Sequence, residues 1–223
     1  MNDRPVPAPA VSPQTFRRLP YYLQYLRALR DTGAASVSAP AAAARFGFTE
    51  VQVRKDFAAV SQTGGRPKHG FDLQELIEAI ERALGYHSAH NAVLIGAGSL
   101  GRALLSYDGF RQYGVHFAAA FDADPALAGT RVGGVPVLSA TELERFCRGT
   151  RVGIGILTVP APAAQAVCDR LVGAGVPAVW NFAPVHLVVP EGVLVQNENM
   201  ASSLAMLSKH LRGRLQSEGR ERA

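Results

Sequence analysis

The sequence predicts an α/β protein in which a small helical unit precedes a doubly wound parallel sheet. Three observations lead to this prediction. Residues 14–85 show helical apolar spacing broken by glycines, residues 91–179 alternate short apolar runs with helical stretches, and a glycine-rich turn follows the first of those runs. Alternation of strands and helices is typical of a parallel sheet covered by helices on both faces.

Composition bounds the class of protein. The 223 residues are 48% hydrophobic and 18% charged, which supports an ordinary core and excludes collagen-like or wholly disordered chains. Cys147 and Cys168 form no C-x-x-C pair, so we interpret them as buried thiols rather than zinc or disulfide ligands. No signal-peptide core is visible, and glycines and prolines break the longest uncharged run, 171–190. We expect a soluble, reduced, cytoplasmic protein without a membrane segment or a metal site.

The positive charge of the chain is concentrated in its first third. Residues 1–70 hold ten Lys and Arg against four Asp and Glu, whereas residues 71–223 hold thirteen against fourteen. A basic small end joined to a neutral large end indicates a module that binds a polyanion, attached to a second domain.

The basic part of the chain contains the start and stop signals of four successive helices. After a flexible tail (1–13), Ser12-Pro13 starts a first helix, whose apolar stripe of Phe16, Leu19, Leu23, Leu26 and Leu29 is interrupted by Pro20 and stops at Gly33. Helix, glycine-containing turn and helix, over 38–47 and from 49 onward, form a helix-turn-helix pattern. Residues 64–70 suit a β-wing, and a further helix spans 72–84. We therefore predict a winged-helix domain over 14–85.

The third helix carries the candidate DNA contacts. With Val53 and Phe57 facing inward, Lys55 points outward and Gln52 and Arg54 lie at the rims, a set of side chains that can contact bases and phosphates in a major groove. Basic residues outside this helix would contact phosphates. They are Arg66 and Lys68 in the wing and Arg17 and Arg18 on the first helix.

The second domain is predicted over 86–199, followed by a C-terminal helix and tail over 200–223. Its buried strands are expected at 92–95, 116–121, 152–157 and 176–179, with helices at 100–105, 141–148 and 162–172. The C-terminal helix is expected over roughly 200–215, after the sheet.

The glycine turn indicates a dinucleotide site. Gly96, Ala97, Gly98, Ser99, Leu100 and Gly101 form G-x-G-x-x-G between a predicted strand and a predicted helix. The three glycines allow the tight turn, the approach of backbone to a pyrophosphate and close packing of helix on strand, as in Rossmann-type domains. Asp122 ends the second strand, where a carboxylate binds the ribose hydroxyls and repels a 2′-phosphate. NAD is therefore favoured over NADP.

A dehydrogenase needs an acid or base beside the nicotinamide and usually a substrate domain. No Tyr-x-x-x-Lys occurs, the three lysines are Lys55, Lys68 and Lys209, and His186 alone follows a late strand. We interpret His186 as a surface or core residue and expect no enzyme activity. Two alternatives stay open: an NAD-dependent oxidoreductase with an appended basic domain, and a nucleotide-binding adaptor whose basic end contacts RNA or protein.

Six motifs, taken in order, resemble one known family. They are Phe16 to Pro20, Gln52 to Phe57, Gly96 to Gly101, Phe121 to Pro125, Leu157 to Pro160 and Asn181 to Pro184. Over residues 14–211 the chain resembles the Rex redox-sensing transcriptional repressors. The resemblance implies a homodimer with an exchanged C-terminal helix, and release from double-stranded operator DNA when NADH replaces NAD⁺. It also implies a nicotinamide site formed by Thr158, Val159, Pro160, Asn181, Phe182, Ala183 and Pro184.

The same resemblance assigns a switch region and shows where the chain departs from the family. Tyr107 matches the family's switch tyrosine, and Met200 lies at the start of the exchanged helix. Gln24 and Asn199 stand where relatives carry an Arg and an Asp that pair across subunits, so this chain has two amides in place of a charged pair. The wing, 65–70, also differs from the commoner Arg-Gly-x-Gly form.

Overall fold

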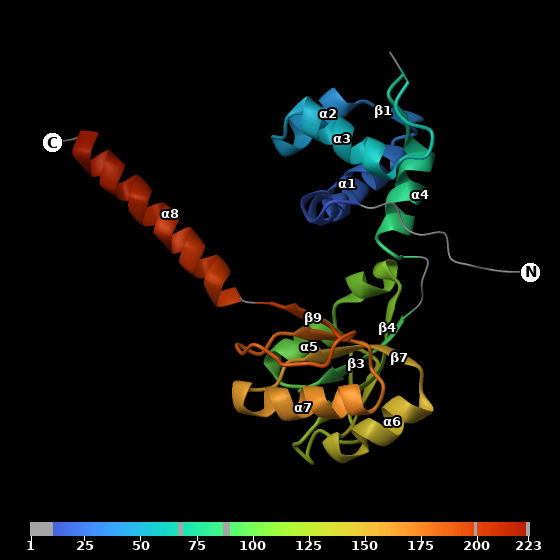
Figure 1. Ribbon diagram of the computed structural model, residues 1–223, viewed down its shortest axis with the longest axis vertical. Helices are drawn as coiled ribbons and strands as arrows, with labels where there is room; N and C mark the ends of the chain where they lie inside the picture. Colours follow the sequence, from blue (N-terminus) through green and yellow to red (C-terminus); the bar gives the residue numbers. More distant parts are fainter. Residues whose placement is uncertain (1–10, 67–68, 87–89, 199, 222–223) are drawn as a thin grey trace, which may run out of the picture. The chain divides into compact units, whose positions relative to one another are not determined.

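The computed structural model describes residues 11–66, 69–86, 90–198 and 200–221. The chain folds into two compact units. We call them the N-terminal unit, residues 1–89 with 112–114, and the C-terminal unit, residues 90–111 with 115–223. In Figure 1 the helices of the N-terminal unit run from blue to teal, and the ribbon of the C-terminal unit runs from green to red.

The N-terminal unit is helical. Its elements are α1 (Pro13–Asp31), β1 (Ser36–Val37), α2 (Ala39–Phe46), α3 (Glu50–Val60), β2 (Phe71–Asp72) and α4 (Leu73–Ala83). Each helix begins with a side chain that accepts a hydrogen bond from the backbone three residues later, and these N-caps are Ser12, Ser38, Thr49 and Asp72. α2 ends at Gly47 in the left-handed conformation, which lets the chain turn directly into α3. The predicted helix-turn-helix is confirmed.

The first helix differs from its prediction in two respects. It continues through Pro20, which lies on its exposed side, so the predicted interruption is wrong. Phe16 is 46% exposed, whereas Thr15 and Tyr22 are buried. The apolar stripe therefore begins at Leu19, because Thr15 and Tyr22 turn inward to donate hydrogen bonds to a buried carboxylate, Asp56.

The wing is short in the described residues. β1 and β2 pair antiparallel, with Val37 opposite Phe71, and an isolated antiparallel bridge joins Arg66 to Gly70. Residues 67 and 68, and with them the predicted DNA contact Lys68, lie outside the described residues.

The C-terminal unit is built on a seven-stranded sheet. Its strands are β3 (His90–Ile95), β4 (Val115–Asp122), β5 (Arg131–Val132), β6 (Val135–Ser139), β7 (Val152–Leu157), β8 (Ala178–Asn181) and β9 (Leu194–Asn197). The order across the sheet is β5-β6-β4-β3-β7-β8-β9, and all pairs except β5–β6 are parallel. The chain leaves β3 toward β4 on one side and returns to β7 on the other, which places the topological switch point at the carboxyl end of β3.

Helices cover both faces of this sheet, as the sequence predicts. α6 (Leu143–Gly149) and α7 (Ala161–Gly173) bury Leu143, Cys168 and Leu171 against one face (Figure 1). α5 (Ser99–Leu105) packs Leu105 on the other face, beside Leu94 and Ile156. Two 3₁₀ segments, η1 (Asp108–Tyr113) and η2 (Ala140–Glu142), complete the connections.

Strand predictions were accurate only for the inner strands. β7 matches its predicted range, β3 and β4 are longer than predicted, and β8 starts two residues late, after Pro177, which has no N–H for a ladder. The strands β5, β6 and β9 were not predicted, because they are short and, apart from Val135 and Val137, half-buried or exposed, without a continuous apolar run.

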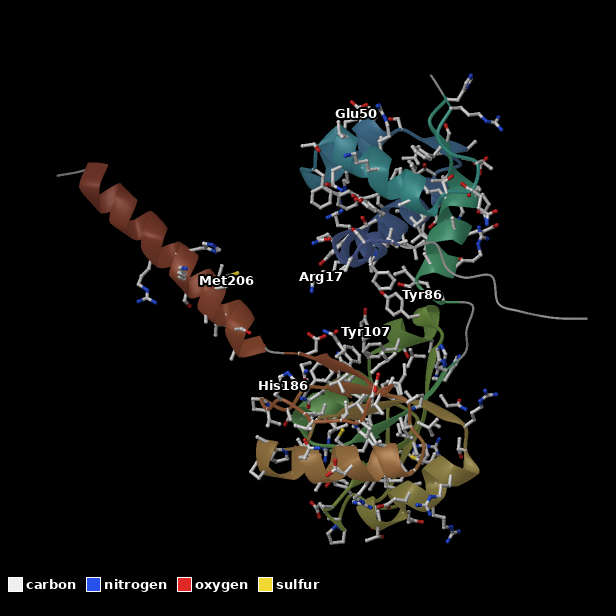
Figure 2. All side chains as sticks on the ribbon, viewed as in Figure 1. Arg17, Glu50, Tyr86, Tyr107, His186 and Met206 are labelled. Carbon is white, nitrogen blue, oxygen red and sulfur yellow. The ribbon has the colours of Figure 1, made fainter. Side chains whose placement is uncertain are left out.

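The last helix, α8 (Met200–Glu221), presents apolar side chains to solvent. Leu204, Leu207 and Leu211 follow at three- and four-residue intervals and are 57–64% exposed. Figure 2 labels Met206, which projects from the same helix and is 61% exposed. None of the described helices combines the length and the hydropathy needed to cross a bilayer.

Candidate functional site

The glycine turn at the carboxyl end of β3 leaves room for a ligand at one glycine and none at the other two. A Cβ on Gly96, which has φ +99°, would lie 2.7 Å from the Thr158 carbonyl oxygen. A Cβ on Gly101 would lie 2.1 Å from the Gly96 oxygen, so α5 packs directly on the turn. A Cβ on Gly98 would meet nothing within 4 Å. Because Gly98 is also the N-cap of α5, the open space faces the start of the helix, where a pyrophosphate binds in such folds.

Asp122 lies beside this turn. It ends β4, and its Oδ2 accepts a hydrogen bond of 2.6 Å from the Ala97 backbone N–H. Oδ1 accepts a second bond of 2.9 Å from Asp124 N–H. The two bonds fix the carboxylate, and each oxygen keeps a further lone pair for a hydroxyl donor. This position, at the end of the neighbouring strand, is the one predicted for the adenosine ribose.

The segment after β7 contacts the glycine turn. The Thr158 hydroxyl donates to the Gly96 carbonyl oxygen at 2.7 Å, and its N–H donates to the Ile95 oxygen at 2.9 Å. Val159 is half-buried and Pro160, the N-cap residue of α7, is exposed. The structure therefore places the segment predicted to contact the nicotinamide beside Gly96. Both lie at the carboxyl ends of the central strands, at the topological switch point.

The Asn181 side chain is engaged inside the protein. It is fully buried, and its amide nitrogen lies within hydrogen-bond distance of the Ala183 and Val185 carbonyl oxygens and of Asn197 Oδ1. Its Oδ1 accepts from Ala183 N–H at 3.0 Å. The Asn181 side chain thus shapes the loop after β8, and its place in the nicotinamide site stays a prediction. Phe182 in that loop is half-buried, Ala183 is buried and Pro184 is exposed.

The predicted switch residues divide between described and undescribed parts of the chain. Tyr107 is 54% exposed and lies edge-on to Phe110, with ring centroids 5.1 Å apart. Gln24 is exposed on α1. Asn199 lies outside the described residues, as does the side chain of Met200.

The geometry supports no catalytic or metal-binding role for His186, Cys147 or Cys168. His186 is exposed on the loop after β8, and Figure 2 labels it there. Cys147 and Cys168 are buried as predicted, and burial raises the pKa of the Cys147 thiol to about 11. Across the described ranges no three His, Cys, Asp or Glu side chains are grouped to hold a metal ion.

In the N-terminal unit, α3 exposes a face that carries both basic and apolar side chains. Arg54 and Lys55 are exposed as predicted, and Val51 beside them is 60% exposed. Arg54 forms an i,i+4 ion pair with Glu50, which Figure 2 labels at the start of α3. Lys55 has no hydrogen-bond or ion-pair partner among the described residues. A groove of about 990 Å³ lies between β1, the start of α2 and the wing, and Arg54, Arg66 and His69 are among the residues that line it.

A buried carboxylate behind this face was missed by the sequence prediction. Asp56 is 1% exposed and accepts hydrogen bonds from Thr15 (2.9 Å), Tyr22 (2.7 Å) and Gln52 (3.0 Å). Arg18 adds two bonds, from Nε at 2.7 Å and Nη2 at 2.8 Å. Burial alone would raise the pKa of Asp56, but these hydrogen bonds outweigh it and lower the pKa.

The assignment of Arg18 to a DNA phosphate stays a prediction, since in this structure Arg18 binds Asp56. Its guanidinium is directed at Asp56 and only 20% exposed, whereas the neighbouring Arg17 is exposed and free to reach outward. Gln52 is also engaged by Asp56, within α3 itself, whereas the bonds from Thr15, Arg18 and Tyr22 tie α3 to α1. A signal for Asp56 existed, because it occupies an inward position in the series Val53, Asp56, Phe57, Val60.

A winged helix-turn-helix unit joined to a dinucleotide-binding parallel sheet defines a nucleotide-responsive DNA-binding protein. Two family models match the chain: "CoA binding domain" over residues 87–185 and "Putative DNA-binding protein N-terminus" over residues 10–58.

The chain belongs to the Rex family. It is 40% identical over 210 residues to the redox-sensing transcriptional repressor Rex of Porphyromonas gingivalis, covering 94% of each chain. It is 43% identical over 196 residues to Rex of Streptomyces avermitilis, covering 88% of this chain and 77% of that one. The Rex-family repressor RSP in complex with β-NAD⁺ and operator DNA superposes with a TM-score of 0.85 at 33% identity, covering 94% of this chain and 96% of RSP. Its complex with β-NADH gives 0.81 at 33% identity, covering 94% and 98%.

Proposed function

We propose that this chain represses transcription by binding operator DNA through α3 and the wing, and releases the DNA when NADH replaces NAD⁺ at the edge of the sheet. The observation that carries the proposal is the open space at Gly98 beside the fixed carboxylate of Asp122. This is a cradle for a dinucleotide in a chain whose other unit is a winged helix. Its Rex relatives are named redox-sensing repressors.

The nucleotide would be held along its length by residues of the C-terminal unit. Gly98 and the first turn of α5 (Ser99 and Leu100) would face the pyrophosphate, and Asp122 would accept hydrogen bonds from the ribose hydroxyls. Val159, Pro160 and Phe182 would line the nicotinamide half. The bound nucleotide supplies a ring that is cationic when oxidised and neutral when reduced. An apolar lining disfavours the cation, so these residues would hold the reduced form in the released state.

DNA would be read by the exposed part of α3. Lys55 has no intramolecular partner in the described part of the chain, so it can reach a base or a phosphate without breaking a bond. Arg54, Arg66 and Arg17 would contact phosphates. Gln52 could read a base with the part of its amide that Asp56 does not engage.

The functional form would be a homodimer. The apolar stripe of Leu204, Leu207 and Leu211 on α8 would be unfavourably exposed to water in a monomer. In a homodimer, the second copy of the chain offers an apolar surface that would cover this stripe. Helix exchange between subunits is the arrangement that the family resemblance implies.

No observation favours the oxidoreductase. His186, the one histidine after a late strand, is exposed, and its Nδ1 lies 3.2 Å from the Leu187 carbonyl oxygen. We propose that the nucleotide acts as a signal and not as a cosubstrate.

The proposal is tested with a DNA duplex selected from random sequences by repeated rounds of binding in the presence of NAD⁺. Fluorescence anisotropy then gives the operator Kd with NAD⁺ and with NADH. We expect NADH to raise this Kd at least tenfold. Equal Kd values with the two nucleotides would refute the proposal, and so would oxidation of NADH on addition of a panel of carbonyl substrates.

A further inference from the structure

Four aromatic rings form a continuous row in the C-terminal unit. The row, defined as Phe182, Trp180, Phe110 and Tyr107, begins in the loop after β8 and ends in the segment after α5. Successive ring centroids are 4.7, 5.7 and 5.1 Å apart, and the last two contacts are edge-on. Phe117 of β4 supports it from the side, 5.8 Å from Phe110. The row thus connects the loop that would face the nicotinamide with the half-exposed Tyr107.

The outer end of the row is fixed by a glycine. A Cβ on Gly109 would lie 2.2 Å from Cζ of the Tyr107 ring, so only the absence of a side chain lets this ring lie against the backbone of η1. Tyr107 therefore packs against Gly109 and Phe110 and is still 54% exposed. Its position depends on Phe110 and Gly109, and through Phe110 on Trp180.

The inner end of the row is tied to the segment before α8. Trp180 Nε1 donates a hydrogen bond of 3.0 Å to Glu198 Oε1. Glu198 N–H donates to the Asn181 carbonyl oxygen at 2.8 Å, and the Asn181 amide donates to Asn197 Oδ1 at 2.8 Å. Because Glu198 lies two residues before the start of α8, Trp180 contacts both the ring row and the chain that leads into this helix.

We propose that Trp180 is a positioning residue for the nucleotide switch, and that it acts through two contacts, the rings of the row and the carboxylate of Glu198. A shift of Phe182 on exchange of NAD⁺ for NADH moves Trp180. Trp180 then repositions Tyr107 at one end and the start of α8 at the other. This inference rests on the proposed function. It goes beyond that function by naming the side chains that carry the coupling between nucleotide and DNA.

The test measures coupling, defined as the operator Kd with NADH divided by the operator Kd with NAD⁺. Trp180→Phe keeps a ring in the row and removes the N–H donor, and Glu198→Leu removes the acceptor. We expect each variant to lower the coupling at least fivefold while the Kd for NADH changes less than threefold. Glu198→Gln keeps an acceptor oxygen and should retain the coupling of the parent chain.

Two controls separate coupling from ordinary packing. The Phe121–Phe146 pair, 5.5 Å apart on the opposite face of the sheet, offers a matched control: Phe146→Leu should lower the unfolding temperature and leave the coupling unchanged. If Trp180 and Glu198 act through one bond, the double variant Trp180→Phe/Glu198→Leu should be no worse than either single variant. Trp180 is the only tryptophan of the chain, so its emission spectrum should shift in Glu198→Leu and not in Phe146→Leu.

The outcomes distinguish this inference from the function on which it rests. A parent chain that NADH does not release from the operator overturns both. A parent chain that switches normally, together with Trp180→Phe and Glu198→Leu variants that switch as steeply, overturns the inference alone. Loss of coupling in Phe146→Leu to the same extent also overturns it, because the effect would then be one of general packing.

Discussion

Replacing Asp56 by alanine should loosen the DNA-binding unit more than any change on its outer face. The carboxylate is 1% exposed and accepts five hydrogen bonds, four of them from α1 and one from Gln52 on its own helix. Asp56→Ala would leave the Arg18 guanidinium and the Tyr22 hydroxyl without their acceptor. Both donors are too enclosed for water to replace the lost bonds fully.

The size of the effect follows from the burial of the partners. Removing one member of a buried ion pair costs about 3–5 kcal/mol. Arg18 is 20% exposed, so water screens part of its charge and favours the lower end of that range. The orphaned Tyr22 hydroxyl adds about 1 kcal/mol or more. We expect a loss of about 3–4 kcal/mol, which corresponds to a decrease of roughly 150-fold or more in the equilibrium constant for folding of this unit.

Hydrogen exchange of the full chain, measured by mass spectrometry, reports the loss of stability caused by Asp56→Ala separately for each segment. Backbone amides of α1 and α3 should lose at least 100-fold in protection in Asp56→Ala, whereas peptides from β3 and β7 should not change. Glu50→Gln is the matched control, because it removes an exposed ion pair from the same helix, with the Arg54 and Glu50 side chains 62% and 45% exposed. Such a pair contributes about 0–1 kcal/mol.

The pH dependence provides an independent check. The pKa of Asp56 is lower in the folded chain than in the unfolded one, so its contribution is fully present above the unfolded value and is lost as pH falls through the folded value. The difference in protection between the parent and Asp56→Asn should therefore be largest near neutral pH and shrink below about pH 4. A decrease in protection of less than tenfold in Asp56→Ala at pH 7 would refute the reasoning.

Four further changes test the assigned sites. Gly98→Ala should weaken NADH binding at least tenfold with little change in thermal stability. Gly101→Ala should instead lower the melting temperature, because its Cβ would lie 2.1 Å from a carbonyl oxygen. Calorimetry measures the NADH affinity and the melting temperature of both variants. Asp122→Ala should narrow the preference for NADH over NADPH in equilibrium titrations, and equal affinities in the parent would contradict the assignment. Lys55→Ala should reduce the slope of log Kd for operator DNA against log salt by about one if Lys55 contacts a phosphate, while leaving NADH affinity intact. Leu207→Arg on α8 should shift the sedimentation coefficient from dimer to monomer, because it places a charge in an apolar interface.

The parts of the fold that the sequence predicted are those with strong local signals. β3 and β7 are buried apolar runs, and the turn at Gly96 has the spacing of a motif whose glycines each have a steric reason. The helix starts were equally readable, because Ser12 and Thr49 are N-caps followed by helical spacing. Edge strands such as β9 lack these signals, since they are stabilised by pairing with a distant neighbour and not by their own composition.

The candidate site was predicted in position more accurately than in role. Thr158 and Asp122 lie at the predicted sheet edge because parallel strands place their carboxyl ends together. Asn181 and Arg18 were assigned to ligands, yet both satisfy polar groups inside the protein. A motif fixes where a residue lies along the chain, but the direction of a polar side chain depends on partners that no local pattern contains.

Asp56 and Trp180 illustrate the same limit from opposite units of the chain. Asp56 is buried and Trp180 is half-buried, and each has a polar partner far along the chain. Arg18 lies 38 residues from Asp56, and Glu198 lies 18 residues from Trp180. A buried polar group that lacks partners costs free energy, so each of these contacts restricts which arrangements of the surrounding elements are stable. Asp56 restricts the orientation of α3 relative to α1, and Trp180 restricts the start of α8 relative to β8. A nucleotide-controlled repressor requires both kinds of restriction, because a ligand can shift binding of DNA only through elements that have few alternative positions.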